Sequence, residues 1–166
     1  VVAWSTVRTM MRISLKEKWK SRQVDFANAF VQADLKEDVY ITMPPGFSCP
    51  DYMGQPKDLA MKLDKSLYGL VQAPLYWYNK LTGALASHGF EPSDHDKCLF
   101  YGNGMVALIY VDDVVFFGPD QDKIDKLINS MRDIDKFNIN VEDDFFHFLG
   151  VDISKDDDTF TLKQTG

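Results

Sequence analysis

Residues 105–117, Met-Val-Ala-Leu-Ile-Tyr-Val-Asp-Asp-Val-Val-Phe-Phe, form an apolar stretch whose only charges are Asp112 and Asp113. Glycines flank the stretch on both sides, so it predicts two short strands joined at the acidic pair. An aspartate pair is also a common turn filler. However, Tyr110 and Val111 are poor residues for a tight turn, and adjacent carboxylates repel each other unless a cation compensates. The pair therefore indicates a site for a hard divalent cation such as Mg²⁺, which prefers oxygen ligands.

A further acid, Asp25, lies inside the apolar strand-like segment Gln23-Val24-Asp25-Phe26. An exposed position on an edge strand would explain it equally well. If its strand were the neighbour of the strand that leads to Asp112, the two carboxylates could share two metal ions about 3.5–4 Å apart. The spacing along the chain does not establish that adjacency.

Around these acids, helices and strands are mixed without a regular βαβ period. Helical spacing is present over 3–19, 74–87 and 123–132, with a turn or short helix over 27–33. Strands are predicted over 24–26, 39–43, 60–63, 98–101, 145–153 and 160–162, and residues 47–58 have the composition of a loop. Two of the strands, 151–153 and 160–162, flank the polar turn at 156–158. The pattern favours an α+β fold, with helices on one face of an antiparallel sheet.

Length and composition place the chain among globular proteins of one domain or a large piece of one. It has 166 residues, of which 45% are apolar, and no apolar run approaches the roughly 20 residues of a membrane-spanning helix. The N-terminal segment lacks signal-peptide features and an initiator Met, so we expect a piece of a longer protein. The two cysteines, Cys49 and Cys98, are too few for a disulfide scaffold. His95 and Cys98 form an H-x-x-C without a second ligand pair, which argues against zinc.

The net charge of −7 is unevenly distributed and at first argues against nucleic acid as a partner. Residues 1–90 carry 11 Lys and Arg against 8 Asp and Glu, whereas residues 91–166 carry 7 against 17. Six bases lie in the first 22 residues. The chain therefore begins with a basic segment and continues into an acidic half.

Several motifs, in order along the chain, resemble one family. Tyr110-Val111-Asp112-Asp113 resembles the Y-x-D-D box of reverse transcriptases. Residues 24–30 resemble the V-D-V-x-x-A-F segment of copia-type retrotransposon polymerases, and residues 62–74 resemble their K-L-x-K-S-L-Y-G-L-K-Q-A-P. Further matches follow in family order at 37–47, 77–78, 88–90, 93–98 and 148–153. The ordered set covers nearly the whole chain and is far more specific than a Y-x-D-D box alone.

The resemblance implies RNA-directed DNA synthesis by two-metal nucleotidyl transfer from deoxynucleotides to a primer 3′-hydroxyl. Asp25 and Asp112 would be the metal-bridging carboxylates, supported by Asp113. The implied cofactor is a pair of Mg²⁺ ions, with Mn²⁺ as an alternative. The implied partners are an RNA or DNA template, a DNA primer and deoxynucleoside triphosphates.

The resemblance also implies how the substrates are held. Phe30 matches the aromatic residue that crowds the sugar 2′ carbon, so that a ribonucleotide clashes with the ring. Gln72 matches a glutamine that contacts the incoming nucleotide, and Tyr110 is expected to pack near the primer end. Leu149 and Gly150 belong to the hairpin that positions the primer terminus.

The expected architecture is a polymerase palm, an α+β fold with an antiparallel sheet backed by helices, with partial fingers. Residues 1–22 are expected to be the end of the fingers with a leading helix, 23–153 the palm, and 154–166 the start of the connection to the thumb. Fingers, thumb and ribonuclease H regions of a parent polyprotein are expected partners outside the chain. The expected location is intracellular, in a cytoplasmic particle or the nucleus, and not in a membrane.

Some positions depart from the family pattern. Relatives often have Lys where Asn140 stands, and an amide cannot donate a proton to the leaving pyrophosphate as an ammonium can. Val71 and Leu75 are apolar where relatives are often basic, which removes two expected template contacts. The alternative to an enzyme is therefore a degenerate or co-opted retroelement fragment, catalytically inactive, that acts as a binding or structural module.

Overall fold

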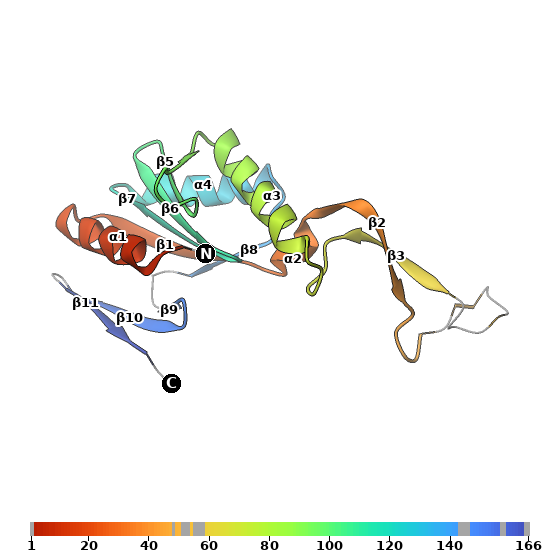
Figure 1. The fold of residues 1–166 in the computed structure, drawn as a ribbon. Coiled ribbons are helices and arrows are strands. Elements are labelled where there is room, and N and C mark those ends of the chain that lie inside the picture. Colours follow the sequence, from red (N-terminus) through yellow and green to blue (C-terminus); the bar gives the residue numbers. More distant parts are fainter. Residues whose placement is uncertain are drawn as a thin grey trace.

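The central feature of the computed structural model is an antiparallel sheet with the strand order β4-β5-β6-β7-β1-β8 (Figure 1). The structure describes residues 2–47, 49–50, 54, 59–142, 147–156 and 159–164. The six strands of this sheet are β1 (Lys20–Phe26), β4 (Glu91–Pro92), β5 (Leu99–Gly102), β6 (Met105–Tyr110), β7 (Asp113–Gly118) and β8 (Ile139–Glu142).

The hairpin predicted over residues 105–117 is confirmed as β6 and β7. Tyr110 pairs with Asp113, so the two residues between them, Val111 and Asp112, make the turn. On its other side β7 pairs with β1 over six residues, from Lys20 opposite Gly118 to Asp25 opposite Asp113. The strand that carries Asp25 is therefore the neighbour of the hairpin that carries the acidic pair.

Helices cover both faces of this sheet, whereas the sequence analysis placed them on one face. The four helices of the described residues are α1 (Trp4–Lys16), α2 (Ala29–Gln32), α3 (Ala73–Ser87) and α4 (Gln121–Asp133). Side chains of α3 and α4 pack with Val24, Phe26, Val114 and Phe116 of the sheet. Side chains of α1 pack with alternate residues of β6 and β7, such as Leu108 and Val115. The apolar run of β6 and β7 does not alternate because both of its faces are buried.

An aromatic cluster anchors the face of the sheet that α3 and α4 cover. Phe26 contacts Trp77 and Phe137 edge-on, with ring centroids 5.2 Å and 5.1 Å apart, and Trp77 contacts Phe137 at 5.8 Å. All three side chains are at most 2% exposed. Burial of each such ring stabilises the fold by about 1.5–3 kcal/mol, and edge-on pairs add about 0.5–1.5 kcal/mol. The end of β1 next to Asp25 is thus firmly packed.

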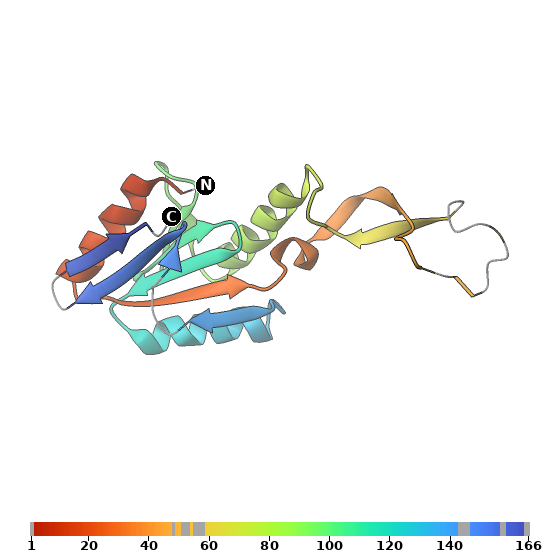
Figure 2. The same cartoon turned by 90° about the horizontal axis from the view of Figure 1, so that it is seen from below.

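Strands β2 (Asp34–Thr42) and β3 (Ala60–Lys65) form a separate antiparallel ribbon that projects from the body of the molecule (Figures 1 and 2). Most of its side chains are exposed or half-buried. The ribbon confirms the strands predicted over 39–43 and 60–63. Most of the loop predicted over 47–58 lies outside the described residues.

The C-terminal part is a small antiparallel sheet of β9 (His147–Phe148), β10 (Val151–Asp156) and β11 (Thr159–Lys163). The strand predicted over 145–153 is confirmed in two parts, because Leu149 and Gly150 form a turn with positive φ that separates β9 from β10. Residues 145–146 lie outside the described part. Phe148 and Ile153 are buried against the face of the central sheet that α1 covers. The strands predicted around the polar turn are confirmed as β10 and β11, although 157 and 158 themselves are not described.

No helix in the described part of the chain is long and apolar enough to span a membrane. The residue boundaries expected for fingers, palm and connection stay predictions.

Candidate active site

Three aspartates lie close together where β1 ends and where β7 begins after the β6–β7 turn. Asp25 and Asp113 are direct partners across the antiparallel pair of strands, and such partners have Cα atoms about 4.5–5.5 Å apart. The carbonyl oxygen of Asp112 accepts a 2.8 Å hydrogen bond from the backbone N–H of Phe26. This bond ties the acidic turn to β1 one residue beyond Asp25. The backbone therefore brings together three carboxylates that are separated by nearly 90 residues of sequence.

The turn that carries Asp112 has an unusual backbone. Val111 has φ 53°, in the left-handed region that β-branched residues rarely adopt. The indole N–H of Trp77 donates a hydrogen bond to the Val111 carbonyl. Because Trp77 is itself locked in the aromatic cluster with Phe26 and Phe137, the core of the protein holds this turn in place. Tyr110 and Val111 were judged poor turn residues from the sequence, and this contact explains how such a turn is maintained.

The electrostatics of the site disfavour a third negative charge. Burial raises the pKa of Asp113 to about 6, a hydrogen bond from Gln23 opposes the rise, and the negative charges of Asp112, Asp25 and Glu142 add to it. The amide Nε2 of Gln23 lies 3.4 Å from Asp113 Oδ1. Repulsion among carboxylates that are this close indicates a place where a cation is favoured.

A second amide reaches the carboxylates from β8. Asn140 is the register partner of Asp25 on the side of β1 opposite to β7. Its Nδ2 donates a 3.1 Å hydrogen bond to Asp25 Oδ2. The sequence analysis identified Asn140 as a departure from the family pattern but not as a contact of Asp25. Cross-strand register, which a sequence alone does not show, was the missing information.

An aromatic pair lies beside the carboxylates. The rings of Phe30 in α2 and Tyr68 are 4.5 Å apart between centroids and tilted by 41°. Burial, and after it the charges of Asp112 and Asp25, raise the pKa of the Tyr68 hydroxyl. Tyr68 is therefore in ring contact with Phe30 and within electrostatic range of the acidic site. Sequence reasoning missed a role for Tyr68, although it lies in the quoted 62–74 motif, which was the available signal.

The other residues that the resemblance singled out lie on different elements. Gln72 is the residue that precedes the first turn of α3. Tyr110 ends β6, and its ring lies 6.0 Å from the ring of Phe148, the residue before the Leu149-Gly150 turn. This contact places the predicted primer-positioning turn next to the acidic hairpin. For Gln72, Phe30, Tyr110, Leu149 and Gly150 the substrate roles stay predictions.

The donor set fits a hard divalent cation that is completed by substrate. Within the part of the chain that the structure describes, no three His, Cys, Asp or Glu side chains are arranged to enclose a metal ion. Asp25 and Asp113 nevertheless oppose each other, with Asp112 beside them, and supply only oxygen atoms. Mg²⁺ typically takes one or two carboxylates, with the remaining positions filled by substrate phosphates and water. The residues present therefore fit a hard divalent cation whose remaining ligands come from outside the chain.

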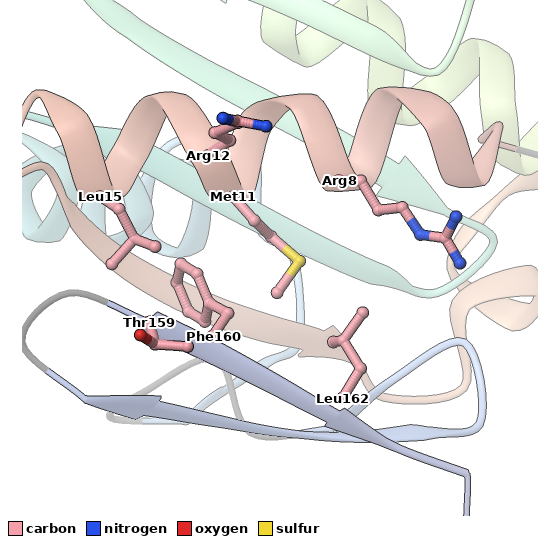
Figure 3. A pocket seen from close by; sticks show the side chains of 7 residues that line it. All are labelled: Arg8, Met11, Arg12, Leu15, Thr159, Phe160 and Leu162. Carbon is pink, nitrogen blue, oxygen red and sulfur yellow. The ribbon is translucent and has the colours of Figure 1, made fainter.

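A hollow of about 370 Å³ lies elsewhere, between α1 and β11 (Figure 3). Met11 and Leu15 of α1 point toward Phe160 and Leu162 of β11, and Arg8 lies at one end of the hollow. None of the three aspartates lines it. The hollow lies between α1 and the C-terminal sheet and is separate from the acidic site.

Comparison with known proteins identifies the family. The reverse transcriptase (RNA-dependent DNA polymerase) family matches residues 1–166. A retrovirus-related Pol polyprotein from transposon RE1 of Arabidopsis thaliana is 33% identical over 159 residues, 93% of this chain and 10% of that protein. A Pol polyprotein from transposon TNT 1-94 of Nicotiana tabacum is 33% identical over 132 residues, 76% of this chain and 10% of that protein. A truncated transposon Ty1-A Gag-Pol polyprotein of Saccharomyces cerevisiae is 30% identical over 125 residues, 75% of this chain and 10% of that protein.

No solved structure matches the chain. The chain spans about a tenth of the length of these three polyproteins, and the matches cover 75–93% of its own length. The chain therefore belongs to the reverse transcriptase family, and within it to the copia type.

Proposed function

We propose that this chain carries the catalytic carboxylates of a reverse transcriptase, and that Asp25, Asp112 and Asp113 hold the divalent cations of nucleotidyl transfer. The observation that carries the proposal is the register of Asp25 opposite Asp113. In addition, the Asp112 carbonyl oxygen accepts a hydrogen bond from the N–H of Phe26, the residue after Asp25. When bound, two such cations would lower the pKa of a primer 3′-hydroxyl and neutralise charge on the triphosphate. The substrates are a template, a DNA primer and deoxynucleoside triphosphates.

The chain's own residues provide orientation. Trp77 holds the acidic turn through the Val111 carbonyl, and the amides of Gln23 and Asn140 each bond one carboxylate oxygen. Phe30, held against Tyr68, would crowd the 2′ position of the incoming sugar and favour a deoxynucleotide. The Leu149-Gly150 turn, connected to Tyr110 through Phe148, would position the primer terminus.

A primer-extension assay tests the proposal. The folded chain, an Asp112→Asn variant and an Asp133→Asn control are supplied with Mg²⁺, primer–template and deoxynucleotides. Asp133 is an exposed acid at the end of α4, so its variant tests for a general effect of charge. We expect weak extension by the chain, similar extension by the control, and a loss of at least about a hundredfold in Asp112→Asn, the scale for removal of a group that stabilises the transition state.

The alternative is an inactive, co-opted fragment that acts as a binding or structural module. The neutral Asn140 and the exposed apolar Val71 and Leu75, 96% and 58% accessible, favour it, because they remove charges that relatives often have. Absence of extension by every folded protein in the assay would support this alternative and contradict autonomous catalysis.

A further inference from the structure

Asp25 lies between two unlike neighbours in the sheet. Its partner on β7 is another carboxylate, Asp113, and its partner on the edge strand β8 is a neutral amide, Asn140. Asn140 Nδ2 donates to Asp25 Oδ2 at 3.1 Å, which leaves the second carboxylate oxygen outside this bond. Gln23 has the same relation to Asp113, at 3.4 Å to Oδ1. Each of the opposed carboxylates is therefore held at one oxygen by an uncharged donor.

The backbone that leads to Asn140 is fixed by the two residues immediately before it. The Gln32 side chain donates to the carbonyl oxygens of Ala27 and Asn138 at 2.8 Å and 3.1 Å, and its Oε1 accepts from the Asn138 N–H at 2.9 Å. Ile139 is 6% exposed and packs in the core. Strand β8 thus starts from an anchored position, so the amide of Asn140 binds Asp25 at a small cost in conformational entropy.

The charge of the donor matters as much as its position. A carboxamide can only donate or accept hydrogen bonds at neutral pH and adds no charge, whereas an ammonium makes a stronger, charge-assisted bond to a carboxylate. An ammonium at position 140 would neutralise part of the field that attracts a cation to Asp25. The amide orients the carboxylate and leaves its negative charge intact.

We propose that Asn140 is a positioning residue for Asp25, which holds one carboxylate oxygen with a neutral donor so that the other is available to a divalent cation. This inference rests on the proposed function. It assigns Asn140 no part in proton transfer, because an amide N–H is not an acid at neutral pH. Its effect is on the affinity of the acidic site for cations.

Mn²⁺ binding to the isolated chain tests the inference without requiring polymerase activity. Affinity is measured from the free Mn²⁺ signal in electron paramagnetic resonance, and folding is checked by circular dichroism and urea unfolding. The set comprises the unmodified chain, Asn140→Lys, Asn140→Leu, Asp25→Asn and the control Asn79→Lys. Asn79 is exposed on α3, so its variant makes the same change of charge away from the site.

We expect Asn140→Lys to weaken Mn²⁺ binding at least tenfold and Asn79→Lys to change it less than twofold. Asn140→Leu, which removes the hydrogen bond without adding charge, should weaken binding about threefold with little change in urea unfolding. Asp25→Asn should abolish tight binding.

Equal effects of Asn140→Lys and Asn79→Lys, or unchanged affinity in Asn140→Leu, would overturn the role of Asn140 and leave the proposed function standing. Failure of the unmodified, folded chain to bind Mn²⁺, both alone and with a deoxynucleoside triphosphate added, would contradict both, since the three carboxylates would then not form a cation site. The two failures are thus distinguishable.

Discussion

The β6–β7 and β9–β10 hairpins both turn through two residues, and in each the first of these is a non-glycine residue with positive φ. Val111 has φ 53° and Leu149 has φ 57°. In β9–β10 the second residue, Gly150, also has positive φ, at 72°, which is the pattern of a type I′ turn. In β6–β7 the second residue is Asp112, whose φ is negative. That is the pattern of a type II′ turn, in which glycine normally takes the first position.

The two turns are therefore stabilised by different interactions, one by its own residues and the other by contacts with the core. Gly150 supplies its conformation without steric cost, so the β9–β10 turn is largely specified by its own residues. Val111 occupies a glycine position with a branched side chain, and its conformation depends on contacts from outside the hairpin. Those contacts are the indole N–H of Trp77 on the Val111 carbonyl and the N–H of Phe26 on the Asp112 carbonyl. The hairpin that presents the acids is the one that the core must hold.

The largest expected effect comes from removing that support at Trp77. Trp77→Ala should lower the free energy of unfolding by about 3–5 kcal/mol, the range for truncating a buried aromatic side chain. Trp77→Phe keeps most of the packing but leaves the Val111 carbonyl without its donor, and should cost about 1–3 kcal/mol. Urea unfolding followed by circular dichroism measures both. A Trp77→Phe variant as stable as the unmodified chain would show that the turn does not depend on the indole hydrogen bond.

Glycine substitution compares the two turns directly. Val111→Gly relieves the left-handed strain of a branched residue and should raise the free energy of unfolding by about 1 kcal/mol, after allowance for the greater entropy of glycine in the unfolded chain. Leu149→Gly should gain no more than about 0.5 kcal/mol, because Leu is unbranched at Cβ and its turn already contains Gly150. Differential scanning calorimetry gives both melting temperatures. A larger gain at Leu149 would reverse the comparison.

Many of the helices and strands were predictable, because local sequence patterns indicate them. The run 105–117 predicted a hairpin with the acidic pair at its turn, although Asp113 is the first residue of β7 and only Asp112 lies in the turn. The helical spacing predicted α3 to within a residue of its start. Placement of the helices was not predictable in the same way. The β6–β7 run is apolar without alternation, so its sequence does not show which face each helix covers or that α1 and the C-terminal sheet cover the second face.

The pH dependence of stability should distinguish the acidic hairpin from the rest of the chain. Asp113 has its pKa raised to about 6, chiefly by burial, whereas a free aspartate titrates near 3.8. Above pH 6 the carboxylate is charged in both the folded and the unfolded chain, and the folded state bears the full free-energy cost of burying that charge. As pH falls from 6 toward 4 the folded chain takes up the proton first, so this group makes the protein more stable.

In the absence of metal, the contribution of Asp113 to the free energy of unfolding should rise by about 1 kcal/mol between pH 7 and pH 4.5. This figure includes a reduction for partial exposure to solvent. Asp113→Asn should remove this pH dependence and raise stability at pH 7. Asp133→Asn, at an exposed position on α4, serves as the control. Urea unfolding at several pH values measures the effect, and an Asp113→Asn profile parallel to that of the unmodified chain would contradict it.

The candidate site divides in the same way between local and tertiary information. Asp25, Asp112 and Asp113 stand out as charges inside apolar segments, so a sequence can identify them. Tyr68 does not stand out, because a tyrosine in a loop is common, and Asn140 stands out only as a departure from the family pattern. Their relation to the acids depends on cross-strand register and on the ring contact with Phe30, which only the folded chain shows.

The smallest expected effect measures whether the two hairpins are coupled. The rings of Tyr110 and Phe148 meet edge-on with centroids 6.0 Å apart, near the outer limit for such pairs. A double-mutant cycle with Tyr110→Leu and Phe148→Leu should therefore give a coupling free energy of about 0.5 kcal/mol, at the low end for aromatic pairs. Urea unfolding of the four proteins supplies the cycle.

This coupling is small, but the proposed geometry of the substrates depends on the contact that it reports. If Leu149 and Gly150 position a primer terminus for attack beside Asp112, their turn must keep a fixed relation to the acidic hairpin, since a displacement of about 1 Å can cost a hundredfold in rate. The Tyr110–Phe148 contact lies next to both turns and joins the two sheets at that point. A coupling energy of zero would mean that the hairpins adjust independently. The task of aligning primer and carboxylates would then fall to the bound nucleic acid and not to this contact.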